Sequence, residues 1–104
     1  MISAERWSKF SLCEQMGHIG SEVARARIWD DKKDFKTRNA CIESAFDLID
    51  LTIEDTRWRK RLKEICRLRE LLADHYVDTK CYQVPLSGLE EYCTEFALVA
   101  RKDF

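Results

Sequence analysis

Apolar residues recur every three or four positions along most of this chain, and that spacing limits the fold more than any other feature. In an α-helix it gathers apolar side chains on one face, which must then pack against another element. The chain has only three glycines and one proline, which is few for an all-β protein with its many tight turns. The sequence therefore predicts an all-α fold.

Four such stretches predict four helices, at about 5–29, 35–54, 57–76 and 87–101. The charged run 30–34 predicts the first turn, and the segment 77–85 predicts the only long loop. Ser87-Gly-Leu-Glu90 has the pattern of a capping box, in which each side chain satisfies a free backbone N–H at a helix start. Amphipathic helices joined mostly by short connections predict a single domain over residues 1–104, an antiparallel four-helix bundle.

The composition argues against several classes of protein. The formal net charge is −1, so attraction to nucleic acid or membrane must come from local clusters of charge. No stretch approaches the roughly 18 apolar residues of a membrane span, and the charged N-terminus lacks the apolar run of a signal peptide. We therefore expect a soluble cytoplasmic protein. The five cysteines are Cys13, Cys41, Cys66, Cys81 and Cys93, and no two of them form a C-x-x-C pair. We therefore expect reduced thiols, with no bound metal and no cofactor.

A basic cluster occupies the first part of the third predicted helix. Between residues 57 and 69 there are seven lysines and arginines and one acidic residue, Glu64. RNA-binding proteins combine cations for phosphates with aromatic faces for unpaired bases. The alternative is a solvated helix face whose cations pair with carboxylates of neighbouring helices, with the tryptophan of the cluster in the core. The candidate RNA-binding residues are Arg57, Trp58, Arg59, Arg61 and Arg67.

Arg69 falls within the otherwise apolar stripe of the same helix, at about 100° per residue. A buried arginine needs a partner, because an unpaired buried charge is strongly unfavourable. Glu43, Asp47 and Asp50 of the second predicted helix are candidates for a structural ion pair. Alternatively, the stripe borders a cleft or a subunit contact, where the arginine would meet a phosphate. His75 follows six residues later, at the helix end.

The stretch Arg69-Glu-Leu-Leu-Ala-Asp-His75 resembles the R-x(4–6)-H motif of HEPN-domain proteins, which are small helical bundles of this size. The resemblance implies an RNA-binding or RNA-cleaving protein, often a metal-independent endoribonuclease, a toxin–antitoxin component or the partner of a small nucleotidyltransferase. It also implies a homodimer in which two motifs face one cleft. Arg69 would then stabilise charge on the phosphate, and His75 would act as general acid or base at the ribose 2′-hydroxyl. Glu70 departs from the polar, often uncharged residue that usually follows the arginine, and its charge would repel phosphate.

A second hypothesis is a non-catalytic protein–protein interaction module. The second predicted helix carries an apolar stripe with Leu48 beside it and Leu51 on the opposite side. This surface is broader than one core contact requires, so Leu48 and Leu51 are the predicted dimer interface. The alternative is a central helix that contacts two neighbours within its own chain.

Overall fold

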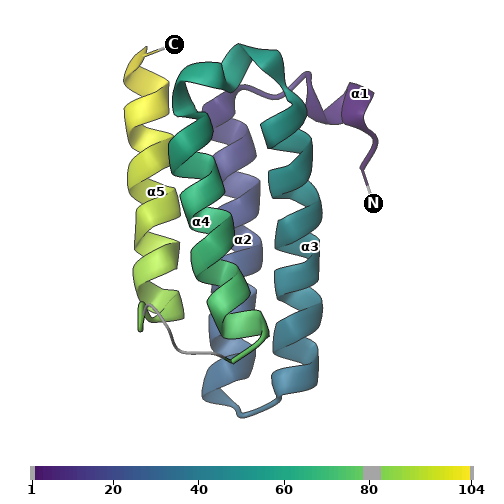
Figure 1. Ribbon diagram of the computed structural model, residues 1–104, viewed down its shortest axis with the longest axis vertical. Coiled ribbons are helices and arrows are strands. Elements are labelled where there is room, and N and C mark those ends of the chain that lie inside the picture. Colours follow the sequence, from purple (N-terminus) through teal and green to yellow (C-terminus); the bar gives the residue numbers. More distant parts are fainter. Residues whose placement is uncertain (1, 79–82, 104) are drawn as a thin grey trace.

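The computed structural model describes residues 2–78 and 83–103, and these residues form only helices and their connections. The all-α prediction is confirmed. Within these residues, two short helices accompany the long ones: α1 (Ala4–Trp7) precedes them, and the 3₁₀-helix η1 (Thr56–Arg61) follows α3. Four long helices lie side by side along the longest axis (Figure 1), namely α2 (Leu12–Asp31), α3 (Phe35–Glu54), α4 (Leu62–Tyr76) and α5 (Leu86–Asp103).

The core lies where the buried faces of the long helices meet. α2 is the central helix, since it packs against both α3 and α5. Gly20 permits the close approach of α5, because a Cβ at this position would lie only 3.1 Å from the Cβ of Cys93. The buried residues of α2 follow the predicted spacing of three or four and are Leu12, Gln15, Met16, Ile19, Val23 and Ala26. No helix among residues 2–78 and 83–103 combines the length and apolar character needed to cross a bilayer.

The first predicted helix, 5–29, is two helices in the structure. α1 ends at Trp7, and α2 begins after Ser11, which forms a capping box with Glu14. The Ser11 hydroxyl accepts from the Glu14 N–H at 3.2 Å, and the Glu14 carboxylate accepts from the Ser11 N–H at 2.9 Å. These bonds satisfy donors that a new helix start leaves free. In α5, by contrast, the Pro85 carbonyl already accepts from Leu89, so the helix begins before the predicted box.

The third predicted helix, 57–76, is also divided. Its first residues form η1, where Trp58 has non-helical dihedral angles (φ −103°, ψ 19°), and α4 starts only at Leu62. Asp55 caps η1 by accepting from the N–H of Arg57 at 3.1 Å. The basic residues at the start of the predicted cluster therefore lie on a tight turn rather than along one helix face. Of the predicted loop 77–85, residues 79–82, with Cys81, lie outside the described residues.

The N-terminal segment covers part of the second apolar side of α3. Trp7 of α1 is buried, and its indole N–H donates to the hydroxyl of Thr52 at 2.9 Å. Leu48 and Leu51 are half-buried; Leu48 shares a depression with Trp7 and Ile2, and Leu51 shares another with Trp7. α3 therefore has neighbours on two sides within its own chain. This agrees with the alternative explanation of its broad apolar surface, a helix that contacts two neighbours of the same chain.

Candidate nucleic-acid interface

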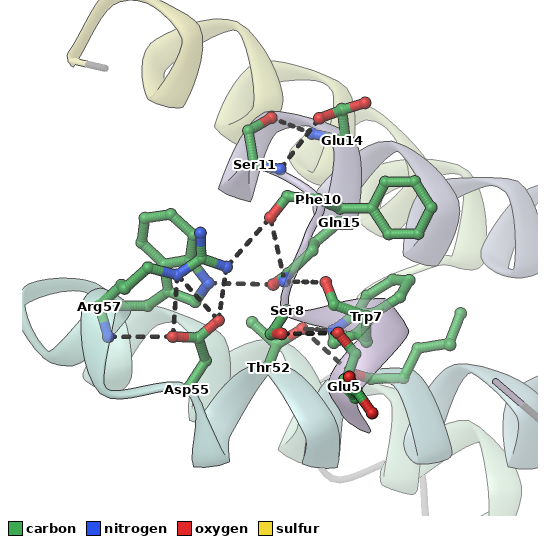
Figure 2. Close-up of polar contacts among 12 residues, drawn as sticks. Glu5, Trp7, Ser8, Phe10, Ser11, Glu14, Gln15, Thr52, Asp55 and Arg57 are labelled. Carbon is green, nitrogen blue, oxygen red and sulfur yellow. Dashed lines mark hydrogen bonds and ion pairs between the residues drawn. The ribbon is translucent and has the colours of Figure 1, made fainter. Parts of the chain in front are cut away.

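Gln15 fixes the turn that carries the basic residues. Its side chain is fully buried in α2. The amide nitrogen donates to the carbonyl oxygen of Trp7 at 2.9 Å, and the amide oxygen accepts from the indole N–H of Trp58 at 3.0 Å. Figure 2 shows the Gln15 amide between the segment before α2 and η1. One buried amide thus joins two segments that are more than forty positions apart in the sequence.

Arg57 links η1 to the segment before α2 on the solvent-exposed side. Its guanidinium forms an ion pair with Asp55 at 2.6 Å and donates to the carbonyl oxygen of Phe10 at 3.0 Å, as Figure 2 shows. Hydrogen bonds from Arg57 hold the pKa of Asp55 below its ordinary value, and the same pair raises the pKa of Arg57. This arginine is therefore committed to contacts within the chain.

Trp58, predicted as a stacking surface, lies in the core. Only 5% of it is exposed, and its indole N–H is bound to Gln15. The guanidinium carbon of Arg57 lies 4.4 Å from the centre of the Trp58 ring. A base could reach this ring only by displacing Arg57 and its contacts.

Two further candidates, Arg61 and Arg67, each face a carboxylate three residues further along the chain. Arg61 lies 3.8 Å from Glu64 and is three-quarters buried, with 22% of its side chain exposed. Arg67 lies 3.3 Å from Glu70 in an exposed pair. Exposed pairs of this kind contribute little to stability, about 0–1 kcal/mol, but they reduce the charge that each arginine offers to a ligand.

Arg69 also has a carboxylate partner. Its Nε lies 2.7 Å from Oδ1 of Asp50, and a second bond reaches Oδ2 at 3.3 Å. The guanidinium carbon lies 4.6 Å from the centre of the Phe46 ring. The hydrogen bonds to Asp50 raise the pKa of Arg69. Asp50 is one of the three carboxylates named from the sequence as possible partners. The Arg69 side chain is 40% exposed, so it lies at the edge of the contact between α3 and α4.

His75 faces a different part of the molecule. Its Nε2 donates to the carbonyl oxygen of Val84, before α5, so this nitrogen carries a proton. Six positions along an α-helix amount to about 240° of rotation, which turns His75 away from the side that Arg69 presents to α3. Within one chain, Arg69 and His75 therefore contact different elements.

The cleft beside His75 holds polar residues that the sequence reading missed. It has a volume of about 750 Å³ and also contains Arg38, which is 8% exposed. Arg38 pairs with Asp30 at 2.9 Å and donates to the His75 carbonyl at 3.3 Å, while Asn39 donates to the Tyr76 carbonyl at 3.4 Å. These bonds satisfy carbonyls that the end of α4 leaves free. Position 38 continues the 3–4 spacing of the apolar stripe of α3, a signal that could have revealed it.

Besides the paired Arg57 and Arg67, three cations of the cluster are exposed to solvent: Arg59 and Lys60 on η1, and Lys63 in the first turn of α4. Within the described residues none of them has an ion-pair partner. Lys60 stands four residues before Glu64, but the 3₁₀ turn alters that spacing and Glu64 pairs with Arg61 instead. Of the RNA-binding residues named from the sequence, only Arg59 is both exposed and without a carboxylate partner.

No group of His, Cys, Asp and Glu in the described part of the chain could hold a metal ion. Comparisons with protein-family models, curated proteins and solved structures find no match to this chain. The candidate interface is therefore defined by its own residues, the basic turn, residues 57–63, which the Gln15 network holds in place. Three of its exposed cations have no carboxylate partner among the described residues.

Proposed function

We propose that this protein is a HEPN-like antiparallel four-helix bundle that binds RNA through the basic turn. The observation that carries the proposal is the exposure of Arg59, Lys60 and Lys63, without carboxylate partners among the described residues. Clustered cations of this kind attract the phosphate backbone by releasing its condensed counterions. The four long helices lying side by side support the bundle, and their number agrees with the HEPN resemblance.

The geometry favours binding over cleavage. Cleavage requires a general acid or base close to the phosphate whose charge is stabilised. Arg69 is paired with Asp50, whereas His75 contacts Val84. A metal-independent endoribonuclease would need the homodimer that the HEPN resemblance implies, with His75 of one copy brought to Arg69 of the other. Such an enzyme would also need Asp50 to release Arg69.

Fluorescence anisotropy with a labelled single-stranded RNA tests the binding proposal. Replacing Arg59, Lys60 and Lys63 together by alanine should weaken binding at least about tenfold at low salt. The matched control is Lys36→Ala, an exposed cation in the first turn of α3, about 30 Å along that helix from η1. The control should bind as the wild type does. An unchanged affinity of the triple variant would refute the assignment of this surface.

The same preparation tests cleavage. Incubating the RNA with wild-type protein in the presence of a chelator should leave it intact under the binding proposal. If the RNA is cut and His75→Ala abolishes the cutting, the catalytic assignment of Arg69 and His75 is correct and the binding-only version is wrong. Cutting that survives in His75→Ala would indicate a contaminating nuclease.

A protein–protein interaction module is the second candidate function. It is favoured by Leu98 and Val99 of α5, which are 54% and 46% exposed. For a homodimer or a nucleotidyltransferase-type partner they are more accessible than the half-buried Leu48 and Leu51, which the sequence predicts as the dimer interface. Sedimentation analysis of the wild type and of Leu98→Glu should show a dimer that the substitution weakens. A monomeric wild type at high concentration would exclude the homodimer.

A further inference from the structure

Arginines of the basic cluster occupy the aromatic faces that a nucleic-acid base would need. In each case the guanidinium carbon lies over a ring within cation–π distance. The three pairs are Arg57 over Trp58 at 4.4 Å, Arg61 over Phe96 at 5.8 Å and Arg69 over Phe46 at 4.6 Å. These three rings therefore already have a cationic partner within the chain.

The rings near the basic turn are also largely inaccessible. Trp58 and Phe96 are 5% and 6% exposed. The half-buried ring of Phe10 packs against Trp7 and His18, with centroids 5.7 and 5.0 Å apart. Stacking on aromatic faces is how proteins usually hold unpaired bases. The buried rings of Trp58 and Phe96 therefore offer little open face for it, and Phe10 already has ring neighbours within the chain.

The arginines that lie over rings also have their charge partly neutralised within the chain. Each arginine that covers a ring also has a carboxylate partner: Arg57 with Asp55, Arg61 with Glu64 and Arg69 with Asp50. Of the other cations, Arg67 is exposed and pairs with Glu70. The exposed cations without a carboxylate partner among the described residues are one arginine and two lysines, Arg59, Lys60 and Lys63. A lysine ammonium is a compact point charge that binds phosphate without the planar, two-pronged geometry that reads a base edge.

We infer that the basic turn binds the sugar–phosphate backbone of RNA irrespective of base sequence and without stacking, so that single-stranded and duplex RNA are both ligands. This inference rests on the proposed RNA binding and specifies its ligand. Three cations can neutralise about three phosphates, and the slope of log K against log salt is then about −2 for single strands and about −3 for duplex RNA, if it behaves like B-DNA.

The experiment compares three length-matched probes, an oligouridine, an oligoadenosine and a duplex RNA of mixed sequence, by anisotropy between about 50 and 200 mM salt. The two single strands should bind with affinities within about threefold of each other. Each of Lys60→Ala and Lys63→Ala should reduce the salt slope by about 1. A 2-aminopurine base placed in the oligoadenosine should keep its fluorescence on binding, because no ring stacks on it.

The outcomes separate this inference from the proposed function. If all three probes fail to bind at the lowest salt, the RNA-binding proposal is wrong and the inference falls with it. If RNA binds but one homopolymer is preferred more than about tenfold, or 2-aminopurine fluorescence changes on binding, RNA binding stands and backbone recognition is refuted. Duplex binding lost while single-strand binding remains would equally refute it. The variant Lys60→Arg keeps the charge and should keep the wild-type slope.

Discussion

Replacing Gln15 by methionine tests whether the buried amide holds the basic turn in place. Methionine preserves the length of the side chain but offers no donor and only a weak acceptor. The indole N–H of Trp58 would lose its acceptor, and a buried donor left without one costs about 1–3 kcal/mol. The Trp7 carbonyl would lose a bond worth about 1 kcal/mol but keep the N–H of Phe10. The free energy of unfolding should therefore fall by about 2–4 kcal/mol.

Urea unfolding followed by circular dichroism measures this loss. With a slope of about 2 kcal/mol per molar urea, the midpoint should move down by about 1–2 M. The control Gln83→Met changes an exposed glutamine before α5 and should shift stability by less than about 0.5 kcal/mol. A double-mutant cycle then isolates the bond itself, because Trp58→Phe removes the donor that Gln15→Met leaves unpaired.

The two substitutions should be less harmful together than the sum of their separate effects, with a coupling of about 1–2 kcal/mol. Removing both partners of a buried hydrogen bond avoids the unpaired group that each single substitution creates. If the effects of Gln15→Met and Trp58→Phe add to within about 0.5 kcal/mol, the bond does not link α2 to η1 energetically, and the proposed fixing of the basic turn is wrong.

Two predictions concern titration. Hydrogen bonds from Arg57 hold the pKa of Asp55 low, so the stability it contributes is complete above about pH 4 and is lost as the pH falls through the lowered pKa. The difference in unfolding free energy between wild type and Asp55→Asn should therefore stay constant above about pH 5 and shrink as the pH is lowered below about 4; an unchanged difference would contradict this. Burial raises the pKa of Cys93 to about 12, so iodoacetamide should alkylate it far more slowly than the half-buried Cys13 and Cys66, as peptide mass spectrometry would show. Equal rates would contradict this.

The fold class followed from the sequence because apolar spacing is a local property of the chain. The same locality explains the misplaced helix ends. The 3–4 spacing runs without interruption through the turn before α2, so periodicity alone could not detect the break. The Ser11-x-x-Glu14 pattern was the available signal. The 3₁₀ turn had no such signal, because Trp58 leaves helical geometry in order to meet Gln15, a residue 43 positions away.

The candidate site was less predictable because its partners come from different helices. The sequence offered three carboxylates for Arg69, and only the rotation of α3 against α4 selects Asp50. His75 meets Val84 for a similar reason, since their contact depends on where α5 begins. The cations of the basic cluster were visible as charges, but the sequence could not tell which of them carboxylates would neutralise.

Arg57 is paired with a carboxylate and Lys60 is not, so substitutions at these two nearby positions should have opposite effects on stability and on RNA binding. Arg57→Ala should lower stability, because it removes the ion pair with Asp55 and the bond to the Phe10 carbonyl, and it should leave the salt slope of RNA binding nearly unchanged. Lys60→Ala should do the reverse, reducing the slope by about 1 while unfolding free energy stays within about 0.5 kcal/mol. Urea unfolding and anisotropy on the same two variants measure both quantities. If the two substitutions lower the slope equally, the arginines of the basic turn contact phosphate as the lysines do, and their contacts within the chain do not withhold them from RNA.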